Sequence, residues 1–213
     1  MERGKFITFE GGEGTGKSTH ARLLATSLEA AGHTVLVTRE PGGTPDAEAI
    51  RALLVSGDPD RWSPEAEALL NYAARDDHLT KQIRPALDAG TWVVCDRYID
   101  STRAYQGSAG GADSGLIDAL ERVVVAETMP DLTLVLDLDP AYGLDRAGTR
   151  AQTAAGQEDR FEGKGDAFHR QLRDAFLRIA EREPDRCLVI DGAGTKEAVA
   201  EIIWQAVVTR LSP

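Results

Sequence analysis

The feature that most constrains this chain is a glycine-rich octapeptide between a short apolar run and an amphipathic stretch. Residues 11–18 read Gly-Gly-Glu-Gly-Thr-Gly-Lys-Ser and match the pattern Gly-x-x-x-x-Gly-Lys-Ser. Glycines allow positive φ angles, so several backbone N–H groups can point at one phosphate, and a helix that starts at Lys17 adds the positive end of its dipole. We therefore predict a strand, a phosphate-binding loop and a helix in this order, with Lys17 beside phosphate and the Ser18 hydroxyl available to Mg²⁺.

Short apolar runs alternate with longer stretches of helical spacing along the chain, which is typical of repeated βαβ units and a parallel sheet. The predicted strands are Phe6–Glu10, Thr34–Thr38, Trp92–Cys95, Leu132–Leu138 and Cys187–Asp191. We predict helices over Lys17–Ala31 and from Pro64 to a stop at Gly90. The fold class is α/β, with a five-stranded parallel sheet and helices on both faces, in a single domain over residues 1–213. A polar stretch at 148–165, rich in Gly and Ala, is predicted to be a mobile loop.

The charge balance restricts the partners of this chain. A formal net charge of −11 argues against a nucleic-acid or anionic-membrane surface, and no apolar run is long enough to cross a bilayer. The N-terminal residues lack the apolar length and cleavage site of a signal peptide, so we expect a cytoplasmic protein. The two cysteines, Cys95 and Cys187, border apolar strand-like runs and are predicted to be reduced, buried thiols.

A phosphate-binding loop does not name a reaction, so several classes of protein remain to be separated. A regulatory GTPase would need an Asn-Lys-x-Asp motif, but the only asparagine is Asn71, which Tyr72 follows. A kinase acting on a small molecule and a nucleotide-binding module without turnover both remain compatible with the loop. A screen of nucleoside monophosphates as phosphoryl acceptors would separate these two classes.

Two arginines follow predicted strands and point to a second phosphate. Thr-Arg-Glu-Pro-Gly-Gly-Thr occupies residues 38–44, after the second strand, and Asp-Arg-Tyr occupies residues 96–98, after the third. Carboxyl strand ends border the ligand crevice of an open parallel sheet, so Lys17, Arg39 and Arg97 should converge beside the ATP phosphates. Two planar guanidinium groups suit bidentate contacts to a second phosphate.

These segments, together with Tyr-Gln-Gly at 105–107 and Asp-Arg-Phe-Glu at 159–162, closely resemble thymidylate kinases. The resemblance covers nearly the whole chain and implies a P-loop NTP hydrolase-like fold of the nucleoside monophosphate kinase type. It implies transfer of the γ-phosphoryl group from ATP to dTMP, giving dTDP and ADP for dTTP synthesis, with Mg²⁺ as cofactor. It also implies a homodimer, and a lid over residues 148–165.

The resemblance assigns roles to individual residues on the acceptor side. Arg39 and Arg97 would hold the dTMP phosphate, and Glu13 would approach the deoxyribose 3′-hydroxyl. Asp96, with Ser18, would arrange Mg²⁺ and its waters. Further residues would surround the nucleoside, with a hydrogen bond from Arg75 to a thymine carbonyl and exclusion of a ribose 2′-hydroxyl by Tyr105; they are Asn71, Arg75, Ser101, Thr102, Tyr105 and Gln106. Many members carry Phe or Tyr at the position of Asn71, where the ring stacks on the base.

On the donor side the resemblance implies contacts to ATP from the phosphate loop and from two residues near adenine. These residues are Gly11, Gly12, Glu13, Gly14, Thr15, Gly16, Lys17, Ser18, Thr19, Arg146 and Ala193. Some thymidylate kinases carry a basic residue among the variable positions of the loop, but residues 12–15 of this chain include none. We therefore predict that lid arginines, Arg160 above all and also Arg150, stabilise charge on the transferring phosphoryl group. The predicted catalytic residues are Lys17, Arg39, Asp96, Arg97, Arg150 and Arg160.

Overall fold

The computed structural model describes residues 2–58, 60–151, 160–161 and 164–213, with the backbone alone described for 147–151. Five parallel strands form one sheet in the order β2-β3-β1-β4-β5. Their bounds are β1 (Phe6–Glu10), β2 (Val35–Arg39), β3 (Trp92–Asp96), β4 (Leu132–Asp137) and β5 (Cys187–Asp191). The strand that leads into the phosphate loop is therefore the central strand. The predicted fold class and all five predicted strands are confirmed, with ends that differ by at most one residue.

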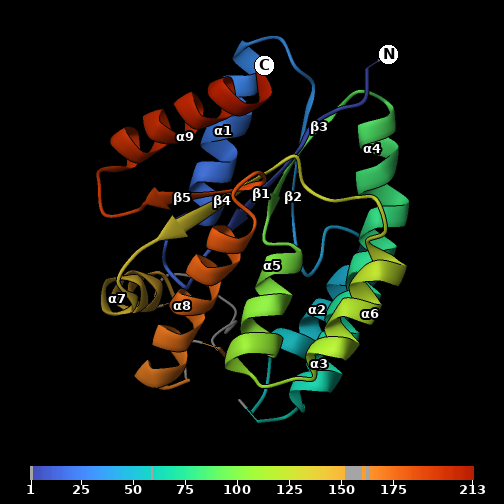
Figure 1. Ribbon diagram of the computed structural model, residues 1–213, viewed down its shortest axis with the longest axis vertical. Helices are drawn as coiled ribbons and strands as arrows, with labels where there is room; N and C mark the ends of the chain where they lie inside the picture. Colours follow the sequence, from blue (N-terminus) through green and yellow to red (C-terminus); the bar gives the residue numbers. More distant parts are fainter. Residues whose placement is uncertain (1, 59, 152–159, 162–163) are drawn as a thin grey trace.

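Helices cover both faces of the sheet (Figure 1). On one face, α1 (Lys17–Ala30) and α9 (Lys196–Leu211) pack against apolar side chains of β1, β4 and β5. The other face carries two clusters of buried side chains. The elements that form this second layer are α3 (Pro64–His78), η1 (Leu79–Ile83), α4 (Arg84–Asp88), α5 (Ile99–Thr102), η2 (Arg103–Ala109), α6 (Ser114–Val124) and α8 (Asp166–Arg182). Two further helices, α2 (Pro45–Val55) and α7 (Pro140–Ala151), follow the carboxyl ends of β2 and β4.

The long helix predicted from Pro64 is interrupted by the π-helical turn η1. Ser63 caps its start by accepting a hydrogen bond from the Ala66 backbone N–H at 3.2 Å, and the helical region stops at Asp88, before Gly90 with φ 80°. Proline has no backbone N–H to donate, so Pro85 removes one hydrogen bond of the helix, and η1 ends two residues before it.

The polar stretch predicted as a mobile lid falls largely outside the described residues, because 152–159 and 162–163 are not described. Residues 148–151 belong to the end of α7, and α8 begins at Asp166. Both cysteines are free and buried, as predicted. Within the described ranges, every helix is too short or too polar to traverse a lipid bilayer.

Candidate active site

The phosphate loop crosses the carboxyl edge of the sheet from the end of β1 to the start of α1. The side chain of Lys17 folds back over it, and its Nζ donates a hydrogen bond to the Gly12 carbonyl at 2.6 Å. Gly14, with φ 66°, lies against the first turns of α7: a Cβ on this residue would lie only 1.8 Å from the Gly143 carbonyl oxygen. Only glycine fits there, because the contact excludes a Cβ and the positive φ disfavours one.

The ammonium group of Lys17 lies in a site that lowers its proton affinity. Burial lowers the pKa of Lys17 to about 8, and the positive charge of Arg97 acts in the same direction, whereas Glu13 opposes it. An anionic phosphate at the loop would reverse this effect by favouring the charged form. The cation needed to bind phosphate is therefore present at neutral pH and is lost as pH rises through about 8.

Two oxygen ligands meet beside the loop. The Ser18 hydroxyl, in the first turn of α1, donates a short hydrogen bond to Asp96 Oδ2 at the end of β3. Hydroxyl and carboxylate oxygens are suitable ligands for Mg²⁺, which keeps most of its other coordination positions for phosphate and water. The described residues contain no group of three His, Cys, Asp or Glu side chains that could hold a metal ion. The pair therefore fits a Mg²⁺ that arrives with a nucleotide.

Arg97 joins the loop to the acceptor side. Its Nη1 donates to the Gly11 carbonyl and to Ser101 Oγ, each at 3.1 Å, and its Nη2 binds Glu13 Oε2 at 3.0 Å. The guanidinium also lies 4.9 Å from the ring centroid of Tyr105, whose hydroxyl donates to the other Glu13 oxygen at 2.5 Å. Arg97 itself has φ 70°, an uncommon conformation for a residue with a side chain.

Glu13 is ionised in this setting. Burial opposes its ionisation, but the charges of Arg97 and Lys17 and the hydrogen bond from Tyr105 lower the pKa of Glu13 to about 2. An ionised carboxylate can only accept hydrogen bonds, so it suits a hydroxyl group of a substrate.

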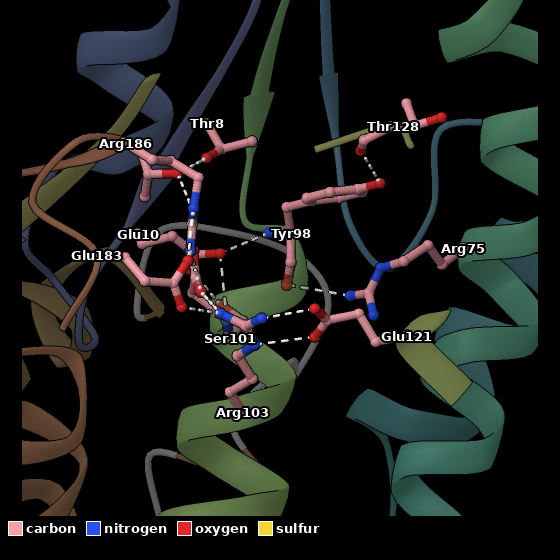
Figure 2. Close-up of polar contacts among 12 residues, drawn as sticks. Thr8, Glu10, Arg75, Tyr98, Ser101, Arg103, Glu121, Thr128, Glu183 and Arg186 are labelled. Atoms are coloured by element: carbon pink, nitrogen blue, oxygen red, sulfur yellow. Dashed lines mark hydrogen bonds and ion pairs between the residues drawn. The ribbon is translucent and has the colours of Figure 1, made fainter. Parts of the chain in front are cut away.

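A second carboxylate, Glu10, supports the turn that carries Arg97 (Figure 2). It accepts hydrogen bonds from the backbone N–H groups of Tyr98 at 2.8 Å and Ser101 at 3.1 Å, and from Ser101 Oγ at 2.6 Å. Its side chain is fully buried. Burial and the nearby Asp100 carboxylate raise the pKa of Glu10 to about 7, against the lowering effects of Ser101 and Arg97.

Asp100 connects the same turn to the segment that leads into the edge strand β5. Arg186, just before β5, holds it by two hydrogen bonds of 2.7 and 3.0 Å, and Arg103 reaches it at 3.1 Å. Figure 2 shows Arg103 reaching Glu121 of α6, to which it is bound at 2.5 and 2.9 Å. The polar segment after β3 is therefore fixed by buried ion pairs to α6 and to the α8–β5 connection, which favours a preorganised site.

Arg75, on α3, is buried and has one unused donor. Its Nε binds Glu40 at 2.6 Å, and its Nη2 donates to the Tyr98 carbonyl at 3.0 Å and to Thr102 Oγ1 at 3.2 Å. Its Nη1 has no hydrogen-bond partner in the part of the chain that the structure describes. Burial works to lower the pKa of Arg75, but Glu40 raises it, so the group stays charged. A buried donor without a partner is costly, and a ligand acceptor would satisfy it.

Two predicted acceptor residues have contacts within the protein. Arg39 is the last residue of β2 and binds Glu48 of α2 at 3.1 Å, with 51% of its side chain exposed. Asn71 is half-buried on α3 and donates to the Glu67 carbonyl at 2.9 Å, a local bond within the helix. Arg39 could therefore exchange an exposed partner for a phosphate, and Asn71 is fixed by its own helix.

Gln106 lies in η2 and donates through Nε2 to Glu67 Oε2 at 2.8 Å. The other Glu67 oxygen binds Arg160 Nη2 at 2.5 Å. Arg160 also donates to the carbonyls of Leu54 at 3.0 Å and Asp58 at 2.9 Å, and its side chain has no exposed area. The structure thus places Arg160, expected at the transferring phosphoryl group, against α2 and α3 on the acceptor side.

Comparisons with known proteins agree with this geometry. The family model described as thymidylate kinase matches residues 9–203. The chain belongs to the thymidylate kinase family. It is 58% identical over 211 residues to the thymidylate kinase of Caulobacter vibrioides, with 99% of each chain covered, and 53% identical to that of Bradyrhizobium diazoefficiens, with 99% of this chain and 92% of the relative covered. The crystal structure of thymidylate kinase from Ehrlichia chaffeensis superposes with a TM-score of 0.78 at 33% identity, covering 96% of this chain and 99% of that one.

As a thymidylate kinase the chain is an ATP-dependent phosphotransferase. The residues that the resemblance assigns to ATP lie around the sheet edge where β1, β4 and β5 end. Thr19 is exposed in the first turn of α1, Arg146 is exposed on α7, and Ala193 is exposed in the turn after β5. The backbone of Arg150 lies in the last turn of α7, and its side chain is outside the described part.

Sequence reasoning missed four acidic residues that support the site of this thymidylate kinase: Glu10, Glu40, Glu67 and Asp100. Each is almost fully buried, and each accepts hydrogen bonds from residues around the predicted site. Glu10 carried a signal, since a charged residue ends an otherwise apolar strand. Glu67 carried another, because it precedes Arg75 by eight residues and therefore lies two helical turns away on nearly the same face.

Proposed function

We propose that this member of the family transfers the γ-phosphoryl group of ATP to dTMP, giving dTDP and ADP for dTTP synthesis. The observation that carries the proposal is the position of Arg97, which touches the phosphate loop at Gly11 and Glu13 and also touches Ser101 outside the loop. A donor site at the loop and an acceptor site around Arg97 would place two phosphates next to each other at one sheet edge. Phosphoryl transfer depends mainly on such positioning and on neutralisation of charge.

On the donor side, Lys17 would neutralise charge on the β- and γ-phosphates of ATP, and the loop backbone would cradle them. Ser18 and Asp96 would hold Mg²⁺, which supplies further neutralisation of phosphate charge when bound. The residues proposed to lie next to the adenine of ATP are Arg146 and Ala193. Arg150 is proposed to reach the transferring phosphoryl group.

On the acceptor side, Arg97 and Arg39 would hold the dTMP phosphate by bidentate contacts, with Arg39 leaving Glu48 to do so. No strong general base is needed, because the attacking phosphate oxygen of dTMP is already anionic near neutral pH. Glu13 would accept a hydrogen bond from the 3′-hydroxyl. The ring of Tyr105 would occupy the space of a ribose 2′-hydroxyl.

The nucleobase would lie against α3 and the segment that follows β3. The unused Nη1 of Arg75 supports this placement, since a thymine carbonyl would satisfy it. The remaining residues proposed to line this pocket are Asn71, Ser101, Thr102 and Gln106. We further propose that the protein is cytoplasmic and forms a homodimer. Light scattering of the purified protein would test the dimer.

A coupled assay of ADP release over the common nucleoside monophosphates tests the function. We expect turnover with dTMP in the presence of ATP and Mg²⁺, and much less with purine monophosphates. Turnover with another monophosphate and none with dTMP or dUMP would refute the assignment of the acceptor. Tight ATP binding without transfer to any monophosphate would indicate a nucleotide-binding module instead.

A further inference from the structure

We propose that Glu67 and Arg160 are positioning residues that fix the amide of Gln106 in the orientation that selects thymine over cytosine. The inference rests on the proposed function, in which Gln106 lines the nucleobase pocket. It assigns to Arg160 a role in choosing the acceptor, whereas the sequence places it at the transferring phosphoryl group.

The three side chains form a buried chain of hydrogen bonds. Glu67 has 6% of its side chain exposed, and its two oxygens bind different side chains. Oε1 accepts from Arg160 Nη2 at 2.5 Å, and Oε2 accepts from Gln106 Nε2 at 2.8 Å. Arg160 is held in turn by two backbone carbonyls, those of Leu54 and Asp58. None of the three side chains can turn without leaving a buried polar atom unsatisfied.

Glu67 decides which end of the Gln106 amide faces it. A carboxylate can only accept hydrogen bonds, so it binds the amide nitrogen and rejects the amide oxygen. The oxygen of Gln106 is therefore turned away from Glu67. A free glutamine could reverse its amide at little cost, but this one cannot, because reversal would place two acceptors together.

Other contacts connect these hydrogen-bonded side chains to the proposed nucleobase pocket. Gln106 lies one helical turn after Thr102, which binds Arg75, and Glu67 lies two turns before Arg75 on α3. The two elements thus face each other with Arg75–Thr102 and Glu67–Gln106 as cross-links, and Asn71 lies between these on α3. A nucleobase placed next to Asn71 would therefore lie between the Nη1 donor of Arg75 and the amide of Gln106.

The orientation of the Gln106 amide matters because thymine and cytosine present different hydrogen-bonding groups at the base edge. Thymine presents an N3–H donor flanked by two carbonyl acceptors, whereas cytosine presents an N3 acceptor next to an amino donor. A glutamine oxygen accepts from thymine N3–H but repels cytosine N3. A glutamine nitrogen would do the reverse. By preventing reversal of the amide, Glu67 adds discrimination against cytosine to the contact with thymine.

Arg160 supplies the charge that a buried Glu67 requires. An unpaired carboxylate with so little exposure would be strongly destabilising, and the guanidinium both neutralises it and saturates one oxygen. Arg160 also lies over the ring of Phe161, at 5.3 Å, and this ring packs edge-on against Tyr105 at 5.4 Å. To act on ATP, Arg160 would have to abandon the Glu67 ion pair and its two carbonyl partners.

The test measures kcat/KM for dTMP and for dCMP, and takes their ratio as the discrimination against cytosine. In Glu67→Gln, Arg160 still needs an acceptor and will hold the new amide oxygen. The new amide nitrogen then faces Gln106 and donates to its oxygen, so the Gln106 amide reverses. We expect the ratio to fall at least tenfold, with kcat/KM for dCMP rising in absolute terms.

Additional variants separate positioning from damage to the fold. In the Gln106→Met background, Glu67→Gln should leave the ratio unchanged, because it acts through Gln106. Arg160→Met should lower the ratio by raising KM for dTMP, with saturated single-turnover transfer reduced less than tenfold, and Arg160→Lys should restore part of the ratio. Arg170→Gln, an exposed arginine on α8, is the matched control and should resemble the wild type.

Each outcome decides the inference. An unchanged ratio in both Glu67→Gln and Arg160→Met, with folding verified by circular dichroism, overturns it. A fall in saturated transfer of more than a hundredfold in Arg160→Met, at an unchanged ratio, identifies Arg160 as the arginine that contacts the phosphoryl group. Absence of dTMP turnover in the wild type would refute the proposed function itself and is seen before any variant is made.

Discussion

Glu10→Gln should change the pH dependence of stability in a direction that burial dictates. Glu10 is fully buried, and its pKa in the folded protein is about 7 against an ordinary value of 4.5. A carboxyl group with a raised pKa binds its proton more tightly in the folded state. Its favourable contribution is therefore complete at low pH and is lost as pH rises toward 7.

The size of the effect follows from these two values. Full ionisation of Glu10 costs about 3 kcal/mol of folding free energy, of which about 2 kcal/mol falls between about pH 5.5 and pH 8.5. The glutamine variant keeps one oxygen for the N–H groups of Tyr98 and Ser101 but has no charge to bury. Relative to the variant, the wild-type protein should lose about 2 kcal/mol of stability over this pH range.

Urea unfolding at several pH values, followed by tryptophan fluorescence, measures this difference. Subtracting the two curves at each pH removes the contributions of all other titrating groups, provided that they are shared. Glu29→Gln, at an exposed residue of α1, serves as the matched control for a Glu-to-Gln substitution outside the buried site. The reasoning would be refuted if the stability of Glu10→Gln minus that of the wild type stayed constant from about pH 5.5 to 8.5, or became smaller as pH rises.

Three further predictions concern the ligand contacts. The Kd of ATP should rise about tenfold between about pH 7 and pH 9, because Lys17 loses its proton near pH 8, and Lys17→Arg should abolish this rise; titrations at each pH check it, and a flat wild-type profile would contradict it. Arg39→Ala should weaken dTMP binding by about 1.5 to 3 kcal/mol and ATP binding hardly at all, since it removes a charge-assisted contact on one side; an equal loss for both ligands in calorimetry would place Arg39 elsewhere. Asn71→Phe should preserve or tighten dTMP binding, because the asparagine amide bonds to its own helix and a ring could add about 1 to 3 kcal/mol of stacking. A folded variant that binds dTMP more weakly would show that the amide contacts the base.

Much of the fold could be predicted because its signals are local. The five strands are short apolar runs, and the caps at Ser63 and Gly90 are local as well, so the residues alone indicate them. The interruption at η1 was missed, since Pro85 allows either a kink or a stop and the packing of the surrounding elements decides. Which elements form is therefore easier to predict from the sequence than where one of them is distorted.

The site was harder to predict where it depends on pairs that are distant in sequence. Lys17 and Ser18 belong to the local glycine-rich motif, and the structure places Ser18 against Asp96, to which the resemblance assigns the same magnesium site. One partner of Arg160 is Glu67, 93 residues earlier, and no spacing rule connects the two. The role predicted for Arg160 therefore rested on its polar stretch and on the resemblance, without knowledge of this buried contact.

The contact between Gly14 and Gly143 limits how this enzyme could acquire a new catalytic charge. An arginine at position 14 would first require α7 to move, because its Cβ would meet the Gly143 carbonyl. At Gly12 an added Cβ meets nothing within 4 Å, so a side chain can begin there without a clash. For protein engineering, and equally for evolution by single substitutions, residue 12 is therefore the more accessible of these two glycine positions for a new charge, while the route through residue 14 needs a prior change in a different helix.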